Sequence, residues 1–341
     1  MATLNISYSP LTLHFKRPSG TSRGILTEKH SWILKIRDEA NLDVLGIGEC
    51  SIIEGLSPDF HDIKQYEAKL DELCKNPSID LSDYPSIKFG LESALLDLTN
   101  GGRRIYFDNN FSKGKKRIPI NGLVWMGDEQ FMREQIEEKL QAGFSTIKMK
   151  IGAINPDVEL NLLKAIRKTY SPDDITLRVD ANGAFTLEEA KKRLSQLAEI
   201  QVHSIEQPIK AGNWKDMKEL CSNTPIPIAL DEELIGVYDT SKKIELLESI
   251  LPQFIILKPS LHGGISGTQE WIRLAEERKI GWWMTSALES NIGLNVIAQL
   301  TAEYQNPLPH GLGTGSLYTN NIPMGLNVEQ GSIYLSLTDV R

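Results

Sequence analysis

The sequence is poor in cysteine and contains neither a cluster of basic residues nor a long apolar run. Its three cysteines, Cys50, Cys74 and Cys221, match neither a disulfide framework nor a zinc-finger spacing, which favours a reducing, cytoplasmic location. No apolar run approaches the roughly 18 residues of a membrane-spanning helix, and residues 1–15 alternate like a strand rather than resembling a signal peptide. The net charge is −8, without the clustered cations that bind nucleic acid. Secreted, membrane and nucleic-acid-binding proteins are therefore not expected.

The composition is that of an ordinary globular protein. The chain has 341 residues, of which 40% are hydrophobic and 24% charged, and it is long enough to bury a large core. At roughly 150 residues per domain, this length fits two domains or a single α/β barrel with additions.

The first part of the chain, up to residue 115, has strands first and helices afterwards. Alternating apolar residues predict a meander of three strands, and apolar residues three and four apart predict two helices that follow it. Two polar, glycine-containing stretches, 18–24 and 55–58, are interpreted as loops. This order is typical of an α+β unit with strands near 12–15, 32–36 and 44–49, and helices over 63–73 and 87–98.

From residue 118 onward, short apolar strands alternate with amphipathic helices. This alternation implies parallel strands with right-handed crossovers, and seven or eight such units indicate a (β/α) barrel. The predicted strands are 120–125, 146–151, 176–181, 203–207, 226–231, 254–259, 281–287 and a weak one near 310–313. Helices predicted between them include 129–141, 158–169, 187–200 and 268–278.

Carboxylates end three consecutive strands of this predicted barrel. Asp180, Glu206 and Asp231 should converge, because the C-terminal ends of barrel strands meet at one mouth. Three carboxylates without thiolate or imidazole neighbours are the hard oxygen ligands that Mg²⁺ prefers. They need a cation between them, because carboxylates that lie so close cannot all stay ionised alone. The spacing therefore predicts a magnesium site.

Lysines occupy the strand ends on both flanks of these carboxylates. Lys148 and Lys150 share one strand face, and Lys258 lies on the opposite flank. A lysine acts as a base near neutral pH only when a neighbouring cation or burial disfavours its charged form, and Lys148 and the metal would provide this for Lys150. Each residue alone fits a solvated strand end or a structural salt bridge. Six ionic residues in register on five strands favour catalysis, because buried charge is costly.

These motifs resemble those of the enolase superfamily over nearly the whole chain. Lys-x-Lys on the second strand with a lysine on the sixth is similar to the muconate-lactonising subgroup, and within it to the o-succinylbenzoate synthases. The stretches 89–98 and 286–290 support this similarity. The residues that carry the resemblance are Lys148-Met149-Lys150, Asp180-Ala181-Asn182, Glu206-Gln207-Pro208, Asp231-Glu232 and Leu257-Lys258-Pro259.

The resemblance implies a fold of class α/β, a modified (β/α)7β TIM-type barrel with an N-terminal α+β capping domain. The domains would be residues 1–115 for the cap, 116–315 for the barrel, and 316–341 for a C-terminal segment that returns to the cap. Homo-oligomerisation stays open, because the sequence does not determine the oligomeric state.

The resemblance also implies a lyase reaction in menaquinone biosynthesis. Mg²⁺, with Mn²⁺ as an expected substitute, would bind a small-molecule carboxylate substrate and stabilise its enediolate. Lys150 would remove the α-proton and return it to the departing hydroxyl in a syn dehydration, Lys258 would stay cationic, and Lys148 would keep Lys150 poised. The residues expected to bind substrate are Asn182, Arg23 in the loop 18–24, and Ser286.

Three other functions stay open. A dipeptide epimerase of the same subgroup usually carries Asp-x-Asp near the eighth strand, and the corresponding stretch 310–316 has no acid. An N-acylamino acid racemase needs no such acid, and Lys150 and Lys258 would then be bases on opposite faces of the substrate. A catalytically inactive barrel that only binds ligands is disfavoured, because all six ionic residues are present.

Overall fold

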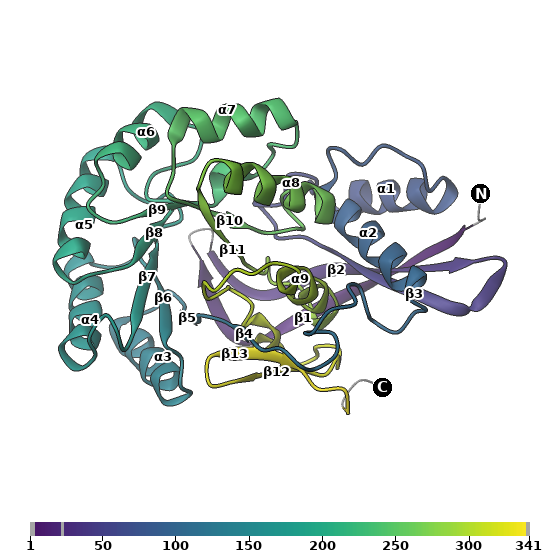
Figure 1. Cartoon of the computed structure of the whole chain (residues 1–341), viewed down its shortest axis with the longest axis horizontal. Helices are drawn as coiled ribbons and strands as arrows, with labels where there is room; N and C mark the ends of the chain where they lie inside the picture. Colours follow the sequence, from purple (N-terminus) through teal and green to yellow (C-terminus); the bar gives the residue numbers. More distant parts are fainter. Residues whose placement is uncertain (1–3, 22–23, 339–341) are drawn as a thin grey trace.

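The computed structural model describes residues 4–21 and 24–338 of the chain. At the right, Figure 1 shows a long antiparallel sheet with two helices packed beside it. At the left, it shows strands and helices that alternate along the chain. No helix in these described ranges is long and apolar enough to cross a membrane.

The N-terminal part is an antiparallel sheet of three strands covered by two helices. Its strands are β1 (Leu4–Thr21), β2 (Gly24–Asp38) and β3 (Asn41–Ser51), and its helices are α1 (Ile63–Lys75) and α2 (Pro85–Thr99). Helix α2 packs directly on β3. The two backbones approach so closely that a Cβ atom added at Gly48 would lie 1.9 Å from the carbonyl oxygen of Gly90. The predicted α+β cap is confirmed.

The described residues of the predicted loop 18–24, namely 18–21 and 24, belong instead to strands β1 and β2 of the first hairpin. Ser19 pairs with Leu26 and Gly20 with Ile25, so the ladder of β1 and β2 continues as far as the pair Thr21 and Gly24. The register shifts between His14 and Ser19, which marks an irregularity around Pro18. A polar stretch with proline and glycine reads locally as a loop, but pairing across the hairpin keeps most of it extended.

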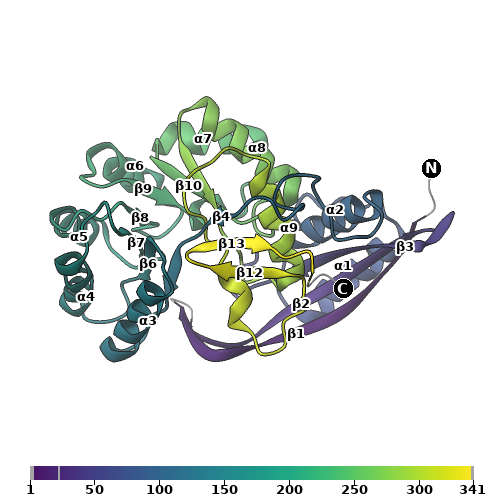
Figure 2. The same ribbon diagram turned by 60° about the horizontal axis from the view of Figure 1, so that its bottom comes forward.

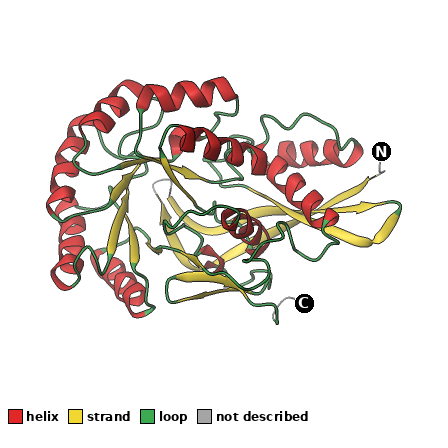
Figure 3. Cartoon of the chain, viewed as in Figure 1, coloured by secondary structure: helices red, strands yellow, loops and turns green. Residues whose placement is uncertain are grey.

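The barrel consists of seven parallel strands that are neighbours in sequence order. The strands are β5 (Gly122–Val124), β6 (Thr146–Lys150), β7 (Thr176–Asp180), β8 (Ser204–Glu206), β9 (Ile228–Leu230), β10 (Phe254–Leu257) and β11 (Gly281–Met284). The helices are α3 (Glu129–Gln141), α4 (Pro156–Thr169), α5 (Leu187–Glu199), α6 (Trp214–Asn223), α7 (Thr240–Ile250), α8 (Gly264–Glu277) and α9 (Asn291–Ala302). In Figure 3 the helices α3 to α8 form an arc outside the strands.

The weak eighth strand is reduced to two isolated bridges. His310 pairs in parallel with Ile120, and Gly311 pairs in parallel with Thr285. The short segment therefore connects the end of β11 with the residues that precede β5. The modified (β/α)7β barrel expected from the sequence is confirmed, with a minimal eighth strand.

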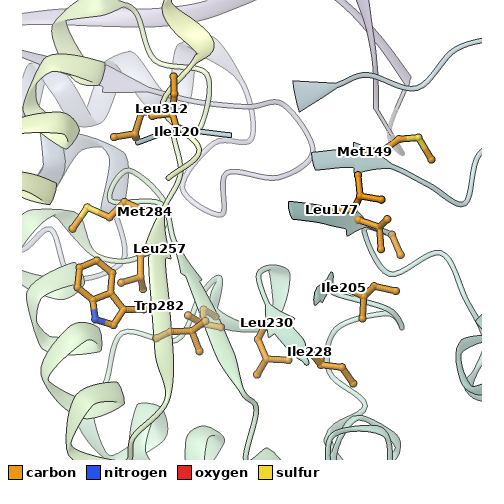
Figure 4. Close-up of a cluster of buried hydrophobic side chains, with 14 of the residues drawn as sticks. Ile120, Met149, Leu177, Ile205, Ile228, Leu230, Leu257, Trp282, Met284 and Leu312 are labelled. Atoms are coloured by element: carbon orange, nitrogen blue, oxygen red, sulfur yellow. The ribbon is translucent and has the colours of Figure 1, made fainter. Parts of the chain in front are cut away.

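Along each barrel strand, successive side chains point alternately to the surrounding helices and to the barrel interior. Figure 4 shows apolar residues of these strands, such as Met149, Leu177 and Ile205, which belong to the large buried core. Successive strand residues point to opposite faces, so Lys148, Lys150 and the other charged residues of these strands point to the interior.

The C-terminal part of the chain contacts both the barrel and the cap. Strands β12 (Leu326–Glu329) and β13 (Ser332–Leu335) form a small sheet with β4 (Ile118–Pro119), which Figure 2 shows in front of the barrel. Tyr318 forms a bridge with Phe15, and the N–H of Thr319 donates to the carbonyl of His14. The domain boundaries at residues 115 and 315 stay a prediction.

Candidate active site

A pocket of about 510 Å³ lies at the C-terminal ends of the barrel strands. The barrel contributes charged residues to its wall, among them Lys150, Asp180 and Lys258, and the cap contributes Ser19 and Leu26. The cap hairpin thus forms one side of the space into which the barrel residues project.

The structure brings the six ionic residues together in this pocket or directly beneath it. The ammonium of Lys150 lies 3.0 Å from Asp180 Oδ2, and that of Lys148 lies 3.1 Å from the same oxygen. Lys148 also donates to Glu206 Oε2. On the opposite flank, Lys258 pairs with Asp231 Oδ2. The predicted arrangement of two lysines on one flank and one on the other is therefore present, while their catalytic roles stay predictions.

Burial and close charge pairs set the electrostatics of the site. Burial alone would raise the pKa of Asp180, but the nearby ammoniums of Lys148 and Lys150 hold it well below its usual value. Glu206 behaves differently, because burial and then repulsion from Asp180 raise its pKa. Burial opposes the charge on Lys258, yet Asp231 raises the pKa of this lysine. The three carboxyls therefore differ, since the pKa values of Asp180 and Asp231 are lowered whereas that of Glu206 is raised.

The donor set fits a hard divalent cation. Within the part of the chain that the structure describes, no three acid, histidine or cysteine side chains already form a metal-binding cluster. However, Glu206 Oε1 and Asp231 Oδ1 are buried and have no hydrogen-bond partner among the described residues. Buried carboxylate oxygens without donors need a partner, and oxygen-only donors suit Mg²⁺. Asp180, Glu206 and Asp231 are therefore the residues that could hold such an ion.

Hydrogen bonds from neighbouring side chains hold the backbone at Asp231 and Lys258. Gln207 follows Glu206 with a positive φ of 36°, and its side-chain oxygen accepts the N–H of Asp231 at 3.1 Å. At the end of β10, His262 Nδ1 accepts the N–H of Lys258 at 3.0 Å. Side chains from neighbouring loops therefore fix the backbone that carries Asp231 and Lys258.

The three predicted substrate-binding residues have different outcomes. Asn182 lines the pocket, accepts from Lys150 at 2.7 Å and adopts a φ of 45°, which asparagine tolerates better than most residues. Ser286 also lines the pocket, and its hydroxyl donates to Glu289 at 2.6 Å. Arg23 lies outside the described residues. The contacts to substrate therefore stay predictions.

Sequence reasoning missed one pocket residue that contacts the proposed base. Trp125 lines the pocket, and the ammonium of Lys150 lies 6.0 Å from the centre of its ring. An aromatic ring at this distance stabilises an ammonium weakly through a cation–π contact. The available signal was its position at the end of the first predicted barrel strand.

Two acids of the cap bind the starts of two barrel helices. Glu92 on α2 accepts the N–H of Ile265 at the start of α8. Glu49 on β3 accepts the N–H and the hydroxyl of Ser290, which precedes α9. Acids are favourable at helix N-termini, because the backbone N–H groups there lack partners within the helix. The cap therefore holds the loops that follow β10 and β11.

Comparisons with known proteins agree with this geometry. Residues 131–337 match a family model described as "Enolase C-terminal domain-like". The o-succinylbenzoate synthase of Desulfotalea psychrophila is 45% identical over 98% of this chain and 100% of that protein. A crystal structure of MenC from the same organism superposes with a TM-score of 0.86 at 42% identity, and covers 97% of this chain and 99% of that one. The D-Ala-D/L-Ala epimerase of Cytophaga hutchinsonii is 29% identical over 86% of this chain and 81% of that protein.

Proposed function

Because the chain belongs to the enolase superfamily, we propose that it is a lyase with o-succinylbenzoate synthase activity. It would dehydrate 2-succinyl-6-hydroxy-2,4-cyclohexadiene-1-carboxylate to 2-succinylbenzoate in menaquinone biosynthesis. The observation that carries the proposal is the near-full-length likeness to the Desulfotalea enzyme, in a chain that keeps all six ionic residues in one pocket or directly beneath it. The three free cysteines and the reaction itself support a cytoplasmic location.

Asp180, Glu206 and Asp231 would hold the divalent cation. Their donor set is oxygen only, and two of their oxygens have no other partner among the described residues. When bound, Mg²⁺ supplies positive charge that stabilises the negative charge developing on the substrate carboxylate. Mn²⁺, which accepts the same oxygen ligands, is expected to replace it.

Lys150 would carry the proton transfers of a syn elimination. It takes the proton from the carbon next to the carboxylate, and the electron pair of that C–H bond becomes delocalised into the carboxylate. The pair then returns to form the new ring double bond as the C–O bond breaks. The departing hydroxyl takes the proton from Lys150 and leaves as water, and the ring becomes aromatic. One base on one face is sufficient for this reaction.

Lys258 and Lys148 would contribute charge. Lys258, paired with Asp231 on the opposite flank, would stay cationic and offset negative charge that spreads into the ring. Lys148 lies between Asp180 and Glu206, so it would neutralise part of their charge and help to orient both acids.

A racemase or epimerase of the same superfamily is the second candidate. The two lysines on opposite flanks favour it, because exchange of an α-proton on both faces needs a base on each. The segment 310–316, which contributes Gly311, Gly313 and Thr314 to the pocket wall, has no acid for a substrate ammonium. A blocked, anionic N-acylamino acid is therefore the more suitable alternative substrate.

The deciding experiment compares both reactions with the purified wild-type protein and Mg²⁺. Loss of diene absorbance measures dehydration of the cyclohexadiene carboxylate. Loss of optical rotation, together with incorporation of deuterium from D₂O, measures racemisation of N-succinylphenylalanine. We expect efficient dehydration. Efficient racemisation with negligible dehydration would overturn the proposed function in favour of the racemase.

A further inference from the structure

A buried polar network connects the cap sheet with the two barrel loops that follow β10 and β11. Its charged members are Lys29 and Glu49 from the cap, and Glu289 from the barrel. Lys29 is 4% exposed, and both glutamates are fully buried. Burial of three ionisable groups is costly unless they are paired and hydrogen-bonded, so their arrangement requires an explanation.

Glu49 is fully satisfied by hydrogen bonds from the cap and from the barrel. Oε1 accepts the hydroxyl of Ser31 at 2.8 Å and the N–H of Ser290 at 2.9 Å. Oε2 accepts the hydroxyl of Ser290 at 2.5 Å and the N–H of Gly293 at 2.9 Å. Four donors on two oxygens is the pattern of an ionised carboxylate, and it fixes the first turn of α9 to the cap.

Glu289 lies next to this helix start and ties two active-site loops together. One of its oxygens accepts the hydroxyl of Ser260, two residues after Lys258. The other accepts the hydroxyl of Ser286 at 2.6 Å, and Ser286 lines the pocket. The N–H of Glu289 donates back to Ser286 Oγ at 3.3 Å. The proton of the Ser286 hydroxyl therefore points to Glu289, and the lone pairs that remain determine how this hydroxyl faces the pocket.

Lys29 supplies the positive charge of the network. Its ammonium donates to Ser51 and lies 3.5 Å from Ser31, the serine that donates to Glu49. Burial lowers the pKa of Lys29, whereas attraction to Glu49 and Glu289 opposes that shift. Lys29 is not among the described residues that line the pocket. An influence on the reaction must therefore pass through other residues.

We propose that Lys29 is a positioning residue: through Ser31 and Glu49, its ammonium fixes the loop 286–290, in which Glu289 accepts from Ser286 and Ser260. Without this cation, Ser31 and the buried carboxylate of Glu49 lose their neighbouring ammonium, and Glu49 is expected to shift together with the N–H and hydroxyl of Ser290 that it holds. This shift moves the adjacent Glu289, and with it the Ser286 hydroxyl and the loop that follows Lys258. Because Ser286 is expected to contact bound substrate, this inference rests on the proposed function.

The test is a double-mutant cycle on the full-length enzyme with Mg²⁺. In Lys29→Met, KM for the cyclohexadiene carboxylate should rise by about tenfold while kcat changes by less than about threefold, because a binding contact rather than the reacting groups is disturbed. In a Ser286→Ala background, the same substitution should change KM by less than about twofold, because residues that act through one contact are not additive.

Lys243→Met is the matched control. Lys243 is also buried, pairs with Glu270 at 2.7 Å, and belongs to α7 rather than to the network. Its loss should lower thermal stability and leave KM within about twofold of wild type. If Lys29→Met lowers stability as this control does but leaves KM unchanged, or if its effect on KM multiplies with that of Ser286→Ala, the positioning role is overturned.

Glu289→Gln tests the same connection from the barrel side, which matters if Lys29→Met fails to fold. It keeps the shape of the side chain and removes its charge, and it should raise KM in the same direction as Lys29→Met. An unchanged KM contradicts the proposal. Wild-type turnover is measured first. Absence of dehydration overturns the proposed function instead, and the cycle is then run on deuterium exchange of N-succinylphenylalanine.

Discussion

Glu49 of the cap accepts hydrogen bonds from both the N–H and the hydroxyl of Ser290, the N-cap residue of helix α9 of the barrel. The two residues are 241 positions apart in the sequence, so this contact can form only when both the cap and the barrel are folded. The loop just before Ser290 carries Ser286 into the pocket. Glu49 therefore links the stability of the interface to the geometry of the site.

Replacement of this carboxylate should destabilise the fold. Glu49→Ala leaves the N–H groups of Ser290 and Gly293 buried without their acceptor, and a lost charged acceptor of this kind costs about 2–4 kcal/mol. Urea unfolding at neutral pH measures the change in free energy. Glu92→Ala is the control, since Glu92 binds the start of α8 in a less buried position. A smaller effect for Glu49→Ala than for Glu92→Ala would contradict this interpretation.

Much of the barrel site could be predicted from sequence because its signal is local. Lys148 and Lys150 stand two residues apart on one strand, and Asp180, Glu206 and Asp231 each end an apolar strand. The strand period and the common direction of barrel strands are enough to bring such residues together.

The supporting network could not be predicted in the same way. No local sequence pattern marks its charged residues, which are Lys29, Glu49 and Glu289. Their hydrogen-bond partners come from other segments of the chain. The stretch 18–24 was misjudged for a related reason. Its composition indicates a loop, while the pairing partners that extend it lie on the other strand of the hairpin.

The proposed activity should require a divalent cation. Treatment with a chelator should abolish turnover, because the charge that develops on the substrate carboxylate loses its counter-charge. Mg²⁺ or Mn²⁺ should restore it. Asp231→Asn should weaken metal binding, measured by titration calorimetry, while circular dichroism shows a folded protein. Full turnover in metal-free buffer would show that the three acids serve another purpose.

Acid should destabilise the protein through a buried histidine. Burial, reinforced by repulsion from Arg178, lowers the pKa of His310 to about 3, and its Nδ1 accepts the N–H of Met284. The neutral ring is thus required in the folded state, whereas the unfolded histidine titrates near 6.5. The unfolded state binds more protons between these values, so stability is present above pH 6.5 and is lost as the pH falls towards 3.

The size of this acid effect can be measured on one variant. His310→Asn keeps an acceptor for Met284 and removes the titration. From pH 7.5 to pH 5.0 the free energy of unfolding of the wild type should fall by about 2 kcal/mol more than that of the variant. Urea unfolding at the two pH values gives both numbers. Equal losses in the two proteins would show that His310 is not responsible for the acid sensitivity.

The two flanking lysines separate dehydration from racemisation. Lys150→Met keeps the length of the side chain but not its basicity, so it should stop both dehydration and exchange of the substrate's α-proton. Lys258→Arg keeps the positive charge and should leave measurable dehydration if Lys258 acts only through that charge, although the bulk of arginine reduces the rate. Arginine is not deprotonated in proteins, so under the racemase mechanism this variant loses one of its two bases. It would then exchange the α-proton of one enantiomer of N-succinylphenylalanine only. Dehydration that survives in Lys258→Arg and is absent in Lys150→Met supports a single base, because only Lys150 then has to be neutral in order to accept a proton.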